Sequence, residues 1–145
     1  MWGEVVGDGG PGGYPGDGEV AAYDSTYVQI SNMNSVDSGT SGIYFVNCDN
    51  CSISGVIMHR ARGWGLDIVG GSDNFTASNN TIKWSWDAGS VFDGRVNLNG
   101  SYVNNYFESN NESIIACNGI AWIANPPSMS GNSAVPPPSS CQWTP

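Results

Sequence analysis

The chain has 145 residues, of which 39% are apolar, 12% are charged and 20 are glycine. Only four Lys and Arg stand against 13 Asp and Glu, and the resulting net charge of −9 argues against nucleic acid or an anionic membrane surface as a partner. No apolar run reaches the length of about 18 residues that a membrane span requires.

The first 19 residues contain eight Gly and two Pro, so we expect no independent regular structure there. Trp2, Val5 and Val6 are expected to cover the open first turn of the next segment, or to form an arm that reaches another subunit. Residues 1–4 have neither the basic start nor the apolar stretch of a signal peptide, which suggests a mature or excised segment.

Residues 43–89 contain the same pattern twice. An apolar run at 43–47 is followed by a polar turn and a second run at 51–55, and the pattern restarts at 66–70 and 75–79. A fixed period of 23–24 residues is typical of a solenoid, in which each repeat forms one turn. One inward column of the solenoid is predicted to contain Val20, Ile43, Leu66, Ser90 and Ile114.

Each repeat consists of short alternating runs of β-branched and aromatic residues, separated by Gly, Asn, Asp and Ser. Such runs are too short for helices, and a leucine-rich repeat would need many more leucines. The sequence therefore predicts an all-β fold: a short, single-stranded, right-handed parallel β-helix of four to five turns of 23–24 residues, stacked about 4.8 Å apart.

The segments NCSISG (50–55) and SNNTI (78–82) resemble repeats of the right-handed, pectate-lyase-like β-helix superfamily. The resemblance extends over residues 20–117 and concerns the fold pattern. It implies that an enzyme of this kind would be a polysaccharide lyase or a glycoside hydrolase. The Asn-Thr-Asp, Asp-Asp, Gly-His-Gly and Arg-Ile-Lys series of the polygalacturonases is absent from the sequence.

Composition divides the chain into three parts. Residues 1–19 are the Gly- and Pro-rich N-terminal segment, residues 20–124 the β-helix domain, and residues 125–145 a Pro-rich tail. The three consecutive prolines at 136–138 predict a polyproline II conformation within the tail.

The four cysteines allow three pairings. We favour Cys117 with Cys141, which would join the tail to the last turn, and Cys48 with Cys51 across a turn between two strands. A redox role for the C-x-x-C pair is the alternative, but the βαβ context of thioredoxin-like chemistry is missing. A zinc site is not expected, because His59 is the only histidine and no second half-site exists.

Five N-x-S/T sequons, together with the cysteines, predict an extracellular protein that is secreted or displayed at a cell surface. The alternative is that these asparagines serve turns of the β-helix. The candidate glycosylation sites are Asn50, Asn74, Asn79, Asn99 and Asn111.

Residues one period apart should stack on neighbouring turns. The longest arc of each repeat predicts an outward column of Asp37, Arg60, Trp84 and Glu108. Two further columns are predicted beside it: Val36, His59, Lys83 and Phe107, and then Gly39, Arg62, Trp86 and Asn110.

This arc is the candidate carbohydrate contact, through Trp84, Trp86, Arg60 and Arg62 with the flanking carboxylates of Asp37 and Glu108. Exposed indoles hold sugar rings, and Arg binds hydroxyls or uronates. The arrangement predicts Arg60 over Trp84 and Arg62 over Trp86. Two other interpretations stay open. The side chains could pair with one another through cation–π and salt contacts and bind no ligand, or the surface could contact another subunit.

Catalysis would need two carboxylates at a defined separation, or a base beside a cationic group. The available acids are Asp67, Asp73, Asp87 and Asp93, and the spacing allows Asp67 and Asp93 to approach each other on neighbouring turns. If the chain is an enzyme, Asp67, Asp93 and Asp87 are the candidates. We favour the interpretation that these acids are solvated turn residues, with no cofactor and no metal.

The function expected from the sequence is a non-catalytic, extracellular structural module, glycosylated and repeated within a filament, shaft or surface glycoprotein. The open ends of a β-helix present unpaired strand edges, so a homo-oligomer or filament is expected. The alternatives are a fragment of a polysaccharide-active enzyme and a carbohydrate-binding module with glycans or polysaccharide as partners.

Overall fold

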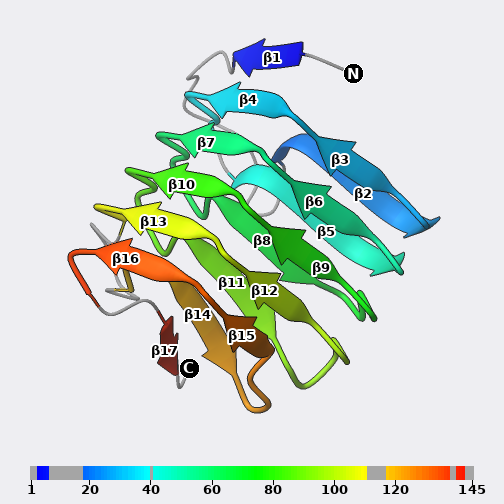
Figure 1. The fold of residues 1–145 in the computed structure, drawn as a ribbon. Coiled ribbons are helices and arrows are strands. Elements are labelled where there is room, and N and C mark those ends of the chain that lie inside the picture. The colour runs from blue at the N-terminus through cyan, green and yellow to red at the C-terminus, as the bar shows by residue number, and fades with distance from the viewer. Residues whose placement is uncertain (1–2, 7–17, 40, 111–116, 138–139, 143–145) are drawn as a thin grey trace.

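The computed structural model describes residues 3–6, 18–39, 41–110, 117–137 and 140–142 (Figure 1). Within these ranges every regular element is a β-strand. No helix in the described part of the chain has the length and apolar character needed to cross a bilayer.

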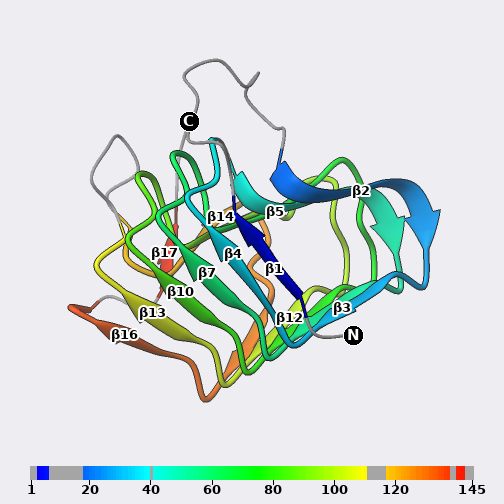
Figure 2. The same ribbon diagram turned by 90° about the horizontal axis from the view of Figure 1, so that it is seen from above.

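The strands form three parallel sheets, which lie on three sides of one interior (Figure 2). Sheet A contains β1 (Gly3–Val6), β4 (Met33–Val36), β7 (Ile57–His59), β10 (Thr81–Lys83), β13 (Tyr106–Glu108) and β16 (Ser133–Val135). Sheet B contains β2 (Gly18–Thr26), β5 (Ser41–Asp49), β8 (Leu66–Val69), β11 (Ser90–Asp93), β14 (Ile120–Ile123) and β17 (Ser140–Gln142). Sheet C contains β3 (Gln29–Ser31), β6 (Ser52–Ser54), β9 (Thr76–Ser78), β12 (Ser101–Val103) and β15 (Ser128–Ser130).

The chain visits sheets B, C and A in turn and makes about five turns of a parallel β-solenoid, which confirms the predicted fold class. In sheet B, the register aligns Val20, Ile43, Leu66 and Ser90 as the period predicts. The next residue of this column is Ile120, whereas Ile114 was expected. The prediction was wrong there because the connection before β14 is longer than its predecessors, and Ile114 itself lies outside the described residues.

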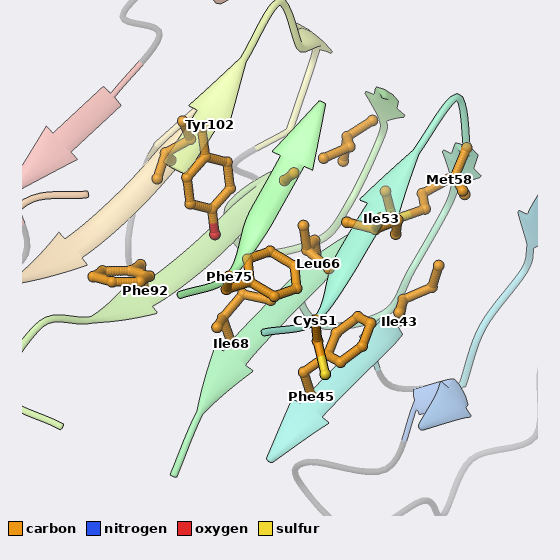
Figure 3. Close-up of a cluster of buried hydrophobic side chains, with 14 of the residues drawn as sticks. Ile43, Phe45, Cys51, Ile53, Met58, Leu66, Ile68, Phe75, Phe92 and Tyr102 are labelled. Atoms are coloured by element: carbon orange, nitrogen blue, oxygen red, sulfur yellow. The ribbon is translucent and has the colours of Figure 1, made fainter. Parts of the chain in front are cut away.

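The interior is a narrow stack of apolar side chains from all three sheets (Figure 3). Phe75 lies between two aromatic neighbours, with ring centroids 5.1 Å from Phe45 and 6.4 Å from Tyr102. The hydroxyl of the fully buried Tyr102 lies 2.9 Å from the hydroxyl of Ser90, so the one polar atom of this side chain is hydrogen-bonded. Each of the three middle turns contributes three or four of the largest fully buried side chains to this core.

Sheet C meets sheet A at a tight corner, which we call the C–A corner. It consists of one residue per turn at positive φ, and the residues that repeat there are Asn32, Gly55, Asn79, Asn104 and Gly131. Asn and Gly tolerate this left-handed conformation better than other residues, which explains the composition of the column.

In the last three turns, the residue after the corner is an asparagine, and Asn80, Asn105 and Asn132 form a ladder. The side-chain oxygen of Asn105 accepts hydrogen bonds from both the backbone N–H (3.0 Å) and the side-chain amide (3.0 Å) of Asn80. Asn132 bonds Asn105 in the same way, at 2.9 Å in each case. Asn80 and Asn105 are 1% exposed, so these bonds satisfy polar groups that water does not reach.

Sheet A connects to sheet B through longer arcs, which we call the A–B arcs. Two of them, residues 60–65 and 84–89, are described in full. Each ends in a glycine that stacks closely on the next turn: a Cβ on Gly65 would lie 2.3 Å from Cγ2 of Ile82 and 2.7 Å from the carbonyl oxygen of Gly89. Only glycine fits this close approach without displacing its neighbours.

The sheets extend beyond the boundaries expected from composition. Gly3–Val6 pairs with Met33–Val36, so this strand lies on the first turn that Val5 and Val6 were expected to cover. The tail after residue 124 adds β15, β16 and β17 to sheets C, A and B, so its described part completes a turn and is no extended spacer. The predicted polyproline segment reaches residue 138, which lies outside the described residues.

The structure contains disulfides between Cys48 and Cys51 and between Cys117 and Cys141, which is the favoured pairing. The first links Cys48 in β5 to Cys51, the residue immediately before β6, and both of its residues are buried. The second joins the A–B arc before β14 to β17. Both therefore link segments of the coil itself, consistent with a structural role.

Candidate functional site

The candidate site lies where sheet A passes into the A–B arcs, and we call it the aromatic–basic corner: Asp37, Arg60, Arg62, Trp84 and Trp86. Asp37, Arg60 and Trp84 each follow a strand of sheet A and have positive φ. Ala61 and Ser85, the intervening residues, are buried. Residues 60, 62, 84 and 86 therefore project outward from two neighbouring turns.

Backbone hydrogen bonds place these side chains in columns. The N–H of Asp37 donates to the carbonyl of His59 (3.0 Å), and the N–H of Arg60 donates to that of Lys83 (3.0 Å), which aligns Asp37, Arg60 and Trp84. The N–H of Arg62 donates to Ser38 (3.1 Å) and that of Trp86 to Ala61 (2.9 Å). Arg62 and Trp86 therefore form a second column beside the first.

The predicted columns lose register by one residue at the next turn. Glu108 aligns with Lys83, and Ser109 takes the place below Trp84 that Glu108 was expected to fill. Phe107 accordingly aligns with Ile82 and is buried. Asn110 is also buried, and its side-chain oxygen accepts from the N–H of Ser85 (2.8 Å), so it does not join Trp86. The prediction was wrong because it kept a constant period where the chain has one residue more.

The cation near the Trp84 ring is Lys83, whose Nζ lies 5.8 Å from the ring centroid. The same Nζ lies 5.4 Å from the Tyr106 ring centroid, and the His59 ring lies 5.4 Å from that of Trp84. Arg60 was expected over Trp84, but its guanidinium instead holds Asp37 through two hydrogen bonds, with Nη2 2.8 Å from Oδ2. A bidentate pair fixes the guanidinium plane toward the carboxylate, which explains the difference.

The remaining charges at the edge of sheet A are also paired. Nζ of Lys83 lies 2.7 Å from Oε2 of Glu108, and the Tyr106 hydroxyl donates to the same oxygen at 3.1 Å. The hydrogen bond from Lys83 lowers the pKa of Glu108, and the hydrogen bond from Arg60 lowers that of Asp37. Partial burial lowers the pKa of His59, and the charges of Lys83 and Arg60 lower it further, so this imidazole is neutral at neutral pH.

Arg62 differs from the other cations of the corner. It is exposed, and within the described ranges it forms no ion pair. Its column neighbour Trp86 is 53% exposed, and Trp84 is 44% exposed. The corner therefore presents two accessible indoles and one guanidinium whose donors are not engaged by a carboxylate.

The acids considered for catalysis are not arranged as a catalytic pair. Asp67 is 1% exposed and aligned with Val91, and burial raises the pKa of its carboxyl to about 8. Asp93 is bound by Arg95, with Nη2 2.7 Å from Oδ2, which lowers the pKa of Asp93. Burial raises the pKa of Asp87. Asp67 is buried and Asp93 is ion-paired with Arg95. The suggested approach of these two carboxylates therefore does not produce an exposed acid–base site.

Among the described residues, no three His, Cys, Asp or Glu side chains form a group that could hold a metal ion. A hollow of about 370 Å³ lies at the other side of the coil, lined by Phe92, Asn97, Leu98, Asn99, Gly100, Asn125, Pro126 and Ser128. Its lining contains no ionisable side chain, so it does not supply the groups that acid–base catalysis would need.

Four of the candidate glycosylation asparagines are exposed: Asn50, Asn74, Asn79 and Asn99. All four have positive φ and lie at corners of the coil, and the side-chain amide of Asn99 donates to Asn74 (3.2 Å). Their positions suit both a turn role and accessibility to modification. Asn111 lies outside the described residues.

The part of this surface that the sequence did not identify is Tyr106, which contacts both Lys83 and Glu108. The alternation of side chains along a strand could have identified it. With Phe107 assigned to the interior, its neighbours Tyr106 and Glu108 must both face outward.

No protein-family model, no curated protein and no solved structure matches this chain. The resemblance to the pectate-lyase-like superfamily therefore rests on the parallel β-solenoid alone, and a fold does not define an activity.

Proposed function

We propose that this chain is a non-catalytic structural β-helix module of extracellular, glycosylated material and that it assembles end to end through the edges of its sheets. The observation that supports this proposal best is the state of the last turn. Its strands continue all three sheets, yet they leave the apolar interior exposed at that end.

The exposure is clearest in β15. The central residue of β12 is buried, whereas all three residues of β15 are exposed. Met129 continues the inward column of Tyr102 and is 37% exposed. Beside it is a hollow of about 160 Å³ lined by Met129, Ser130, Gly131, Asn132 and Ser140. An exposed apolar column beside a strand edge is a surface that another strand can cover.

The number of strands suggests how copies would join. Sheets A and B have six described strands each and sheet C has five. A second copy stacked in the same direction would pair its β1 with β16 and its β2 with β17. One strand position would stay open between β15 and the second copy's β3, and an extended segment of a neighbouring copy can fill it. Such a head-to-tail contact does not close, so its product is a filament.

The polar groups described above fit a structural role. Buried asparagines bond neighbouring turns, and the carboxylates of Asp37, Asp93 and Glu108 are held in ion pairs. The disulfides favour an oxidising, extracellular compartment, and exposed sequon asparagines are available for glycans that would project sideways from the filament axis.

Light scattering and electron microscopy of the purified chain over a range of concentrations test the proposal. We expect growth into filaments, which Met129→Lys should abolish by placing a charge in the end contact. Ile57→Lys is the matched control, because Ile57 is 38% exposed and lies on a side face, against 37% for Met129. Filament growth should survive this control.

A wild-type chain that stays monomeric at high concentration would contradict the proposal. Equal loss of assembly in both variants would contradict the end-to-end geometry. Thermal unfolding of each variant, measured in parallel, shows whether the monomer itself has stayed folded.

A further inference from the structure

The basic side chains of this acidic protein are gathered at one place. The chain has four Lys and Arg and one His, and Arg60, Arg62, Lys83 and His59 all lie at the aromatic–basic corner or on the adjoining edge of sheet A. Arg95, the remaining cation, pairs with Asp93. We propose that this corner binds saccharides that carry an anionic group, through Trp84, Trp86 and Arg62.

The two indoles supply apolar surface for sugar rings. Trp84 and Trp86 are the most exposed tryptophans of the described chain, and they project from one arc on either side of the buried Ser85. Their backbones are anchored to neighbouring turns by hydrogen bonds to Glu108 (3.0 Å) and Ala61 (2.9 Å). Aromatic side chains with an accessible face and few rotatable bonds bind ligands at low entropic cost, so a site held in this way is preorganised.

Arg62 supplies the charge. Arg60 and Lys83 are already neutralised by Asp37 and Glu108, so they add hydrogen-bonding groups and little net attraction. Arg62 lies one turn from Trp86 in the same column and has no carboxylate partner within the described ranges. A guanidinium can grip a carboxylate or a sulfate through two parallel hydrogen bonds. A sugar ring packed on Trp86 would bring such a group within reach of it.

The charge distribution favours a saccharide over nucleic acid. Nucleic acid carries a phosphate charge about every 1.7 Å of duplex axis and requires several unpaired cations. This corner has one, on a chain of net charge −9. A polysaccharide with a single anionic group per ring, and with hydroxyls between them, matches one guanidinium beside two indoles and a set of paired polar groups.

Retention on immobilised polysaccharides tests the proposal. The probes are polygalacturonate, which carries carboxylates, heparin, which also carries sulfates, and dextran, which is neutral. We expect retention on at least one of the two anionic columns and little on dextran, with elution by salt. The relative retention on the first two identifies the preferred anionic group. Single-stranded DNA is the competitor that should not displace the protein.

Two variants and two matched controls locate the site. Trp86→Ala should weaken binding roughly three- to ten-fold through the lost ring contact, and Arg62→Gln roughly ten-fold through the lost charged hydrogen bonds. Tyr27→Ala removes a 74% exposed aromatic ring from another corner, and Arg95→Gln removes the cation that lies elsewhere. Neither control should weaken retention.

Several results would overturn the assignment. These are a wild-type chain that binds neither anionic column, equal retention on dextran, displacement by DNA, or equal losses in Arg62→Gln and Arg95→Gln. The Met129→Lys variant separates this inference from the proposed assembly. The aromatic–basic corner is intact in this variant. Its retention on the anionic columns should therefore equal that of the wild type, whether or not the wild-type chain forms filaments.

Discussion

The C–A corner and the A–B arcs differ in whether their buried polar atoms all have hydrogen-bond partners. At the C–A corner, the amide groups of Asn80 and Asn105 both donate and accept hydrogen bonds between turns. Along the arcs and the strand that follows, Nε1 of Trp64, Oδ1 of Asp67 and Oγ of Ser85 are buried, and none has a hydrogen-bond partner among the described residues. The three unpartnered buried atoms of the described residues therefore lie on the arc side, where the buried amide of Asn110 nevertheless donates to Asn118 and Ile82.

This difference indicates where the fold is specified and where the sequence can vary. Every described turn passes the C–A corner with one left-handed residue, which is either Asn or Gly. The arcs, in contrast, change length, and the one before β14 shifts the column from the expected Ile114 to Ile120. The exposed Trp84 and Trp86 also belong to an arc. We infer that the corner maintains register, while the arcs carry the surface chemistry.

The largest effect is expected from breaking the ladder with Asn105→Ala. The variant leaves the buried N–H and amide of Asn80, the carbonyl of Ala77 and the side-chain oxygen of Asn132 short of partners. Each such group costs about 1–3 kcal/mol, so the free energy of unfolding should fall by roughly 3–5 kcal/mol.

Chemical denaturation measures this loss. The control is Asn104→Gly, an exposed neighbour with φ of 54°, where glycine fits the backbone. Its effect should stay within about 0.5 kcal/mol. A small loss in Asn105→Ala would show that the ladder does not maintain the register.

Asp67→Asn tests a buried carboxyl group with an unpartnered oxygen and should stabilise the protein. Burial raises the pKa of Asp67 to about 8, far above its value in an unfolded chain. Between these two pKa values the unfolded chain is ionised and the folded chain is protonated, so stability falls as the pH rises from about 4 to about 8. At pH 8 the variant should exceed the wild type by a few kcal/mol, and near pH 4 the two should converge.

Denaturation curves at pH 4, 6 and 8 provide the measurement. The difference between Asp67→Asn and wild type must increase with pH. A constant difference would mean that Asp67 is ionised in the folded protein, and that an additional partner stabilises its charge.

The smallest effect is expected from Ser85→Ala. Its hydroxyl is buried without a partner in the described structure, so its removal should leave stability unchanged or raise it by up to about 1 kcal/mol. Ser90→Ala is the matched control, because the Ser90 hydroxyl bonds Tyr102 at 2.9 Å, and its loss should cost about 1–2 kcal/mol. Thermal unfolding of both variants gives the comparison, and an equal loss in each would mean that the Ser85 hydroxyl has a hydrogen-bond partner as the Ser90 hydroxyl does.

The sequence by itself determined the architecture of this protein. A repeat of alternating apolar runs implies stacked turns, since each turn can bury its apolar face only against the next. The period therefore predicted the column of Val20, Ile43, Leu66 and Ser90, and the alignments of Asp37, Arg60 and Trp84 and of Arg62 and Trp86. These predictions needed only spacing.

Tertiary structure alone decided what each side chain does. Asn79 and Asn80 are adjacent and chemically identical, yet Asn79 is exposed at the corner and Asn80 is buried in the ladder. Glu108 pairs with Lys83, because one extra residue in that turn shifts it out of the Trp84 column. A period describes the average turn, whereas burial, pairing and pKa depend on which atoms the neighbouring turn places above and below each residue.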